Sequence, residues 1–136
     1  MYETFEHTAD LGLRIRAKDL NTLFEEAGQA FFSSIVEDLS TVQSRQSVEI
    51  HLASDDVEYL LFDWLRELHY HFDVEHLLLS RFKATVTGTT LIALAQGEPM
   101  DRARHVMLHE VKAITYHGLR VERSGDDWLA EVIVDI

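Results

Sequence analysis

Three acidic groups from the two ends of the sequence are of types that could together bind a hard divalent cation. Asp10 closes the stretch EHTAD (residues 6–10), and Asp135 stands beside the terminal α-carboxylate of Ile136. Ca²⁺ and Mg²⁺ prefer carboxylate and carbonyl oxygens as ligands. We therefore expect the two ends to meet and form an oxygen-rich metal site. The alternative is a frayed, solvated C-terminus.

Two histidines and a lysine are candidates for contact with a partner or for orienting another side chain. His7 lies three positions before Asp10, and His117 ends the stretch VKAITYH that begins at Val111. A histidine beside a carboxylate more often orients it by a hydrogen bond than binds a metal. Lys112, in the same stretch, predicts either a cation that contacts a phosphate or carboxylate, or a solvated lysine on an edge strand.

Several other kinds of site find no support in the residues. The chain contains no cysteine, which excludes disulfides, thiolate metal sites and cysteine nucleophiles. It has no glycine-rich phosphate loop and no nucleophile elbow. His105 and His109 are four positions apart, but Val106 stands where a zincin motif requires glutamate, so we do not expect zinc.

The charge of the chain limits its partners. Twelve Lys and Arg residues against 24 Asp and Glu residues give a net charge of −12. Since Lys and Arg drive binding to phosphates, we expect no tight binding of RNA by this chain alone. The acidic balance suits a cation, a basic protein partner or simple solubility. The N-terminal residues resemble no signal peptide and no apolar run could span a bilayer, so we expect a cytoplasmic protein without membrane contact.

The elements that must position the candidate residues follow from the spacing of apolar residues. Helical spacing predicts a helix over residues 19–36, capped either by Asp19 or by a box of Thr22 and Glu25. A second helix should begin with Ser54 as N-cap and extend to Phe72. Strands are predicted at Tyr2–His7, Leu11–Ala17, Val48–Leu52, Phe82–Thr87, Leu91–Ala95, Val111–Arg123 and Trp128–Asp135, and a surface loop at Asp101–His109.

These elements predict an α+β fold in a single domain over residues 1–136. We expect two helices packed on one face of a mainly antiparallel sheet of about seven strands, because most of the strands are joined as hairpins. Strand parity places Asp10 and Asp135 away from the core face. The same parity turns the side chain of Ile136 inward, which would anchor its carboxylate.

The sequence resembles the archease family along essentially its whole length. The resemblance rests on EHTADLG at residues 6–12, on VKAITYH with the following Gly118-Leu119, and on the terminal Asp135-Ile136. Residues 97–105 also look similar to the family, although no role is assigned to them. The resemblance implies that Asp10, Asp135 and Ile136 bind a divalent metal ion of the Ca or Mg class, and that Lys112 acts at the contact with a partner.

Archeases are protein cofactors of the GTP-dependent RNA ligase that joins 2′,3′-cyclic phosphate or 3′-phosphate ends to 5′-hydroxyl ends in tRNA splicing and RNA repair. The resemblance therefore implies an activator that promotes guanylylation and multiple turnover of that ligase and is not itself an enzyme. The alternatives are a chaperone-like interaction module with a structural cation and a stand-alone metal-dependent hydrolase.

Overall fold

The computed structural model describes residues 1–7 and 10–136, with the side chains of Glu6 and His7 left out. Thr8 and Ala9, which belong to the predicted EHTAD stretch, lie outside the described residues. The elements in chain order are β1 (Tyr2–His7), β2 (Asp10–Ala17), α1 (Leu20–Ile35), the 3₁₀ turn η1 (Leu39–Thr41), β3 (Gln46–Ala53), α2 (Val57–Asp73), β4 (Leu77–Thr87), β5 (Thr90–Pro99), β6 (Ala113–Ser124) and β7 (Asp127–Asp135).

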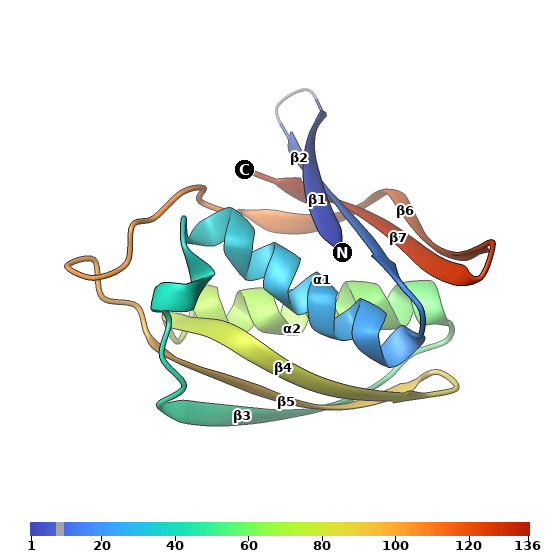
Figure 1. The fold of residues 1–136 in the computed structure, drawn as a ribbon, viewed down its shortest axis with the longest axis horizontal. Coiled ribbons are helices and arrows are strands. Elements are labelled where there is room, and N and C mark those ends of the chain that lie inside the picture. Colours follow the sequence, from blue (N-terminus) through green and yellow to red (C-terminus); the bar gives the residue numbers. More distant parts are fainter. Residues whose placement is uncertain (8–9) are drawn as a thin grey trace.

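The strands form two antiparallel sheets with the helices between them (Figure 1). The first sheet has the order β1-β2-β7-β6, and the second has the order β3-β5-β4. The predicted α+β class, with two helices and seven strands, is confirmed. The strands are divided between two sheets instead of forming one, so the helices bury residues on both of their sides.

The helix starts show which of the predicted caps the chain uses. Asp19 caps α1, because its carboxylate accepts the N–H of Thr22 at 2.7 Å. The N-cap of α2 is Asp56 and not Ser54 as predicted. The hydroxyl of Ser54 donates instead to Asp63 within the helix at 2.6 Å. The carboxylate of Asp56 accepts the N–H of Tyr59 in the first turn. A charged carboxylate at this position also complements the helix dipole.

The core lies where both helices face the two sheets. Its large, fully buried side chains include Trp64 of α2 and Phe24 of α1. The indole N–H of Trp64 donates to the carbonyl of Phe24 at 2.9 Å, so the polar atom of this buried ring is satisfied. Neither helix is long and apolar enough to cross a membrane.

Two strands differ in extent from the prediction. β4 begins at Leu77, five residues before the predicted start at Phe82, and its pairing with β5 shifts register between Leu79 and Arg81. β6 begins at Ala113, so Lys112 precedes the strand in which it was predicted. Its pairing with β7 is interrupted between Thr115 and Arg120.

Candidate functional site

Asp10 and Asp135 lie directly opposite each other in the first sheet. β2 and β7 are antiparallel neighbours whose register pairs these two residues. Residues opposite each other in antiparallel strands share a face, with Cβ atoms about 5 Å apart. Both aspartates alternate with core residues, which turns them toward the outer face of the sheet. Two of the three predicted acidic groups are therefore adjacent.

The third group, the α-carboxylate of Ile136, follows at the end of β7. The side chain of Ile136 is partly buried against the core, as its strand parity predicts. The carbonyl of Asp135 accepts the N–H of Lys112 at 2.7 Å, and Ala113 pairs with Asp135 across β6. The end of β7 is thus held between two strands, which opposes fraying.

The donor set of this site fits a hard divalent cation. Two like charges directly opposite each other destabilise a sheet unless a cation or hydrogen-bond donors lie beside them. All the candidate ligands are carboxylate oxygens, which Ca²⁺ and Mg²⁺ prefer. In the part of the chain that is described, no three His, Asp or Glu side chains gather as a metal site. A complete coordination shell would therefore need the Ile136 carboxylate and further oxygens from outside these two side chains.

Lys112 lies beside a hollow that neither Asp10 nor Asp135 lines. It lines a hollow of about 270 Å³ between α2 and the start of β6, together with Arg66, His69 and Tyr70. His69 Nε2 donates to the carbonyl of Val111 at 3.0 Å and so fixes the chain just before Lys112. The main chain of Lys112 therefore supports the end of β7, and its side chain is exposed.

Of the two candidate histidines, His7 has its backbone paired with Asp10, whereas His117 lies in β6, the neighbour of the strand that holds Asp135. The register of β1 and β2 pairs His7 with Asp10, so its backbone is adjacent to the site. His117 is exposed, four positions beyond Ala113, in the interrupted part of β6. Gly118, which follows it, has a φ of +69°, a conformation that glycine adopts without strain.

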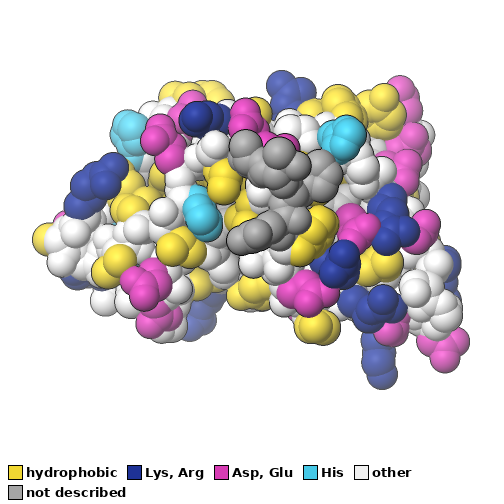
Figure 2. Space-filling view, turned by 90° about the horizontal axis from the view of Figure 1, so that it is seen from above, with side chains coloured by type: hydrophobic (Ala, Val, Ile, Leu, Met, Phe, Trp, Pro, Cys, Tyr) yellow, Lys and Arg dark blue, Asp and Glu magenta, His cyan; other side chains and the backbone are white. Residues whose placement is uncertain are grey.

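Charged side chains on the rest of this outer face largely neutralise one another. Glu131 accepts hydrogen bonds from the Nε atoms of Arg14 at 2.6 Å and Arg120 at 2.7 Å. Burial alone would raise the pKa of Glu131, but these two arginines lower it overall. Figure 2 shows acidic and basic side chains intermingled on the right of this face. The two arginines are thus engaged within the protein and not available as a basic stripe for RNA.

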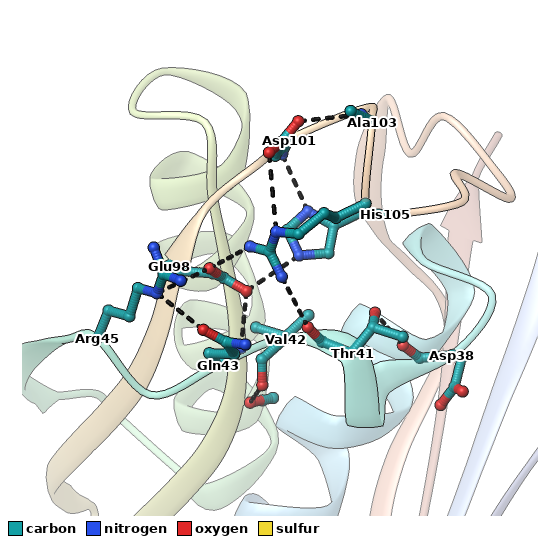
Figure 3. Close-up of polar contacts among 11 residues, drawn as sticks. Asp38, Thr41, Val42, Gln43, Arg45, Glu98, Asp101, Ala103 and His105 are labelled. Atoms are coloured by element: carbon teal, nitrogen blue, oxygen red, sulfur yellow. Dashed lines mark hydrogen bonds and ion pairs between the residues drawn. The ribbon is translucent and has the colours of Figure 1, made fainter.

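A buried carboxylate in β5 was missed by the reasoning from sequence. Glu98 is only 1% exposed. Its Oε2 accepts the backbone N–H of Gln43 at 2.7 Å and a hydrogen bond from His105 at 3.1 Å, and its Oε1 accepts one from Arg104 at 2.5 Å (Figure 3). Burial on its own would raise the pKa of Glu98, but these donors outweigh it and lower the pKa from 4.5 to about 2.

His105, likewise 1% exposed, connects Glu98 to the turn that follows β5. Its Nδ1 accepts the backbone N–H of Asp101 at 2.9 Å, so Nε2 carries the proton that is donated to Glu98. The Asp101 carboxylate accepts the N–H of Ala103 at 2.9 Å. Residues 101–109 form a loop, as predicted, but hydrogen bonds from His105 and Arg104 to the buried Glu98 carboxylate fasten it to the protein.

From this turn the chain runs along the end of α1 to the candidate site. The N–H groups of Leu108 and His109 donate to the carbonyls of Ile35 at 2.7 Å and Ser34 at 3.1 Å. These bonds satisfy carbonyls that a helix end leaves without partners. The segment then reaches Lys112 and its bond to Asp135. Glu98 therefore anchors one end of a segment whose other end adjoins the aspartate pair.

A layer of two helices between two antiparallel sheets, with paired aspartates from an N-terminal and a C-terminal strand, defines a small α+β domain with an acidic pair on one sheet. The chain matches the model of the Archease protein family (MTH1598/TM1083) over residues 2–136. This chain belongs to the archease family.

Individual relatives agree with this assignment. A protein named archease from Methanopyrus kandleri is 38% identical over 139 residues, which cover 99% of each chain. The solution structure of Methanobacterium thermoautotrophicum protein 1598 has a TM-score of 0.88 at 34% identity and covers 99% of this chain and 98% of that one. The crystal structure of a Thermotoga maritima archease, described as a possible chaperone, has a TM-score of 0.64 at 22% identity, with coverage of 100% and 98%, and supports the fold alone.

Proposed function

We propose that this protein is an accessory activator of the GTP-dependent RNA ligase that joins 2′,3′-cyclic phosphate or 3′-phosphate ends to 5′-hydroxyl ends. It would promote guanylylation and repeated turnover of the ligase in tRNA splicing and RNA repair, without ligating RNA itself. Membership of the archease family supports this role. The observation that carries it is the pairing of Asp10 with Asp135 at an accessible end of the first sheet.

In this proposal the aspartates and the α-carboxylate of Ile136 hold a divalent cation of the Ca or Mg class. Such a cation neutralises negative charge that develops on a phosphate during nucleotidyl transfer. The chain's own contribution is to fix the ligands. β7 is held between β2 and β6, and the packed side chain of Ile136 restrains the terminal carboxylate. His7, whose backbone pairs with Asp10, would orient that carboxylate, and His117 would lie toward the ligase.

The decisive experiment is a multiple-turnover ligation assay with and without this protein. We expect the protein to increase both the number of ligation cycles and the fraction of guanylylated ligase. In the absence of ligase it should neither join RNA ends, nor hydrolyse GTP or RNA, nor bind single-stranded RNA tightly at physiological salt. Hydrolysis by the protein alone would favour the metal-dependent hydrolase. Improved ligase solubility without any change in guanylylation would favour the chaperone-like module.

Lys112→Ala is expected to reduce ligase activation by about tenfold while leaving the fold intact. A charge-assisted hydrogen bond contributes roughly 1.5–3 kcal/mol, whereas the loss of one exposed lysine changes stability by less than about 0.5 kcal/mol. Activation and circular dichroism should be measured on the same sample. Lys83→Ala is the matched control, because Lys83 is exposed on β4 in the second sheet. If both variants activated the ligase equally, Lys112 would be a solvated surface lysine without a part in activation.

A further inference from the structure

Two tyrosines meet on the surface of the protein where α2 lies against β6. The rings of Tyr59 in α2 and Tyr116 in β6 have their centroids 5.2 Å apart and are inclined to each other by 59°. Tyr59 is 46% exposed and Tyr116 is 51% exposed. Over the described part of the chain, neither hydroxyl forms a hydrogen bond. Tyrosine is among the residues that contribute most to binding when a partner covers it.

An irregularity of β6 places Tyr116 beside the helix. Residues 116–119 stand opposite the single residue Val132 of β7, because the register of the two strands shifts there. Extra residues in one strand bend it and re-aim its side chains. The ring of Tyr116 stacks on that of Phe62 in α2, with 3.8 Å between the centroids and 16° between the planes. The exposed part of the Tyr116 ring is therefore the part that is directed away from Phe62.

Two carboxylates lie close to these rings. Asp56 accepts the N–H of Tyr59 through Oδ1 at 2.8 Å, and Asp63 accepts the hydroxyl of Ser54 through Oδ2 at 2.6 Å. Among the residues that the structure describes, the second oxygen of each carboxylate has no hydrogen bond, and neither aspartate forms an ion pair. The pKa of Tyr116 is raised, first by desolvation and then by neighbouring groups that include Asp63 and Asp56. The carboxylates are thus held in place, and their charges act on the ring.

Arginine is the cation that this protein itself places on aromatic rings. The cation–π contacts of the described residues all use a guanidinium group: Arg14 over Phe5 at 4.6 Å, Arg66 over Phe62 at 5.4 Å and Arg123 over Trp128 at 5.2 Å. A guanidinium group is planar, so it can lie flat on a ring while its N–H groups donate to a carboxylate. Arg66 opposes the rise in the pKa of Tyr116, but two aspartates outnumber it.

We propose that Tyr59, Tyr116, Asp56 and Asp63 bind an arginine side chain from a basic segment of a protein partner. The guanidinium group lies against the exposed tyrosine rings and donates to the unused aspartate oxygens. The net charge of −12 attracts such a segment to the whole molecule. A nucleobase could also stack on tyrosine, but its phosphates would meet the two carboxylates.

This inference goes beyond the proposed ligase role and does not rest on it. None of the four residues belongs to the candidate cation site, and the surface would serve any partner that offers an exposed arginine. A binding experiment without ligase and without metal therefore tests the surface alone. Its failure would leave the ligase proposal standing, and a failure of ligase activation would leave the surface standing.

Titration with a short peptide, followed by NMR, tests the surface. A capped Gly-Arg-Gly peptide is added to the protein at low ionic strength. We expect the ring signals of Tyr59 and Tyr116 to shift until they saturate, and the arginine side-chain protons of the peptide to move upfield above the rings. A capped Gly-Gln-Gly peptide should leave the ring signals unchanged. Gly-Lys-Gly should bind more weakly, because an ammonium group neither stacks flat nor donates in a fork.

Three variants identify the contacts. Tyr116→Leu keeps Phe62 covered but removes the ring, and should raise the dissociation constant of the arginine peptide about fivefold. Tyr116→Phe keeps the ring and should bind as the wild type does. Asp63→Asn removes a charge but keeps an oxygen for the hydroxyl of Ser54, and should raise the dissociation constant about threefold.

Tyr70→Leu and Asp73→Asn are the matched controls and should bind as the wild type does. Both residues are exposed on α2, and Tyr70 lies about 16 Å along the helix from Tyr59. Circular dichroism checks that each variant is folded. The proposal is overturned by unshifted tyrosine signals, by equal affinity of the wild type and folded Tyr116→Leu, or by a lysine peptide that binds as tightly as the arginine peptide. Uridine monophosphate that shifts the same signals at lower concentration than the arginine peptide would also overturn it.

Discussion

Glu98→Gln is expected to lower the free energy of unfolding by about 3 kcal/mol, a large part of the stability of a domain of this size. The lowered pKa, about 2 instead of 4.5, corresponds to a preference of that order for the ionised form. Glutamine keeps the volume but not the charge. Its NH₂ group would also face donors, either Arg104 on one side or Gln43 and His105 on the other. Denaturation by urea at neutral pH measures the loss.

The pH dependence of stability identifies the ionised carboxylate as the cause. A carboxyl whose pKa is depressed by folding stabilises the protein above its unfolded pKa. That contribution is lost as the pH falls through the folded value. For Glu98 the loss runs from about pH 4.5 down to about pH 2. The gap between wild type and Glu98→Gln should therefore narrow over this window and be constant above it.

Glu110→Gln provides the matched control, since Glu110 is an exposed residue of the same loop region. It should change stability by less than about 0.5 kcal/mol. Equal stability of Glu98→Gln and wild type at neutral pH would contradict the anchoring role of Glu98. Amide hydrogen exchange adds a local readout. The N–H of Lys112 should exchange faster in Glu98→Gln if the segment from Asp101 to Lys112 is held by this cluster.

A C-terminal extension after Ile136 should weaken binding of the proposed cation by at least about tenfold. It would convert the α-carboxylate into a neutral amide and remove one of three negative charges near the cation. At about 4 Å one such charge contributes roughly 1–4 kcal/mol at the effective dielectric constants of a protein surface. Ligase activation should fall with the affinity. Calorimetric titration with Ca²⁺ and Mg²⁺ of the extended and unextended proteins measures the difference.

The same extension placed before Met1 is the control. The N-terminal amine is exposed, donates to the carbonyl of Arg16 at 2.9 Å and forms an ion pair with Glu26. Exposed ion pairs contribute little to stability, so this extension should leave metal affinity unchanged. Equal affinities in all three proteins would show that the α-carboxylate is not a ligand, and the site would reduce to Asp10 and Asp135.

The sequence predicted that Asp10 and Asp135 meet, but this prediction rested on the family resemblance, because strand parity only placed both residues away from the core face. Each residue alternates with apolar neighbours, and each belongs to a strand at one end of the chain. The division into two sheets was not within reach. Periodicity states which face of a strand is buried, but it does not state which strands pair, since pairing depends on contacts distant in sequence.

Glu98 and the residues that bond to it show a second limit of prediction from sequence. The alternation of buried Ala93 and Ala95 with exposed Ile92 and Leu94 would place Glu98 on the exposed side of its strand. It is buried because donors from residues 43, 104 and 105 surround it, and no local pattern predicts their approach. The available signal was a glutamate between Gly97 and Pro99 directly after an apolar strand.

Position 97 accepts only glycine, and the reason is visible only in the structure. A Cβ atom at this position would lie 1.8 Å from the carbonyl oxygen of Leu78, so the backbones of β4 and β5 approach too closely there for any side chain. This close approach brings the end of β5 into the position where Glu98 meets Gln43 and His105. A glycine in a strand marks such a contact, but the sequence alone does not say with what.

The strand order of the first sheet has a consequence for folding. β7 is the last strand of the chain and an interior strand of its sheet, between β2 and β6. Contacts between distant parts of a chain form slowly, because a large loop must close first. β1 and β2 can form a hairpin early in synthesis, yet they gain their neighbour only when the C-terminal residues are released. A chain without β7 would thus lack both the link between β2 and β6 and the pairing of Asp10 with Asp135. The proposed site can therefore form only after β7 has paired with β2.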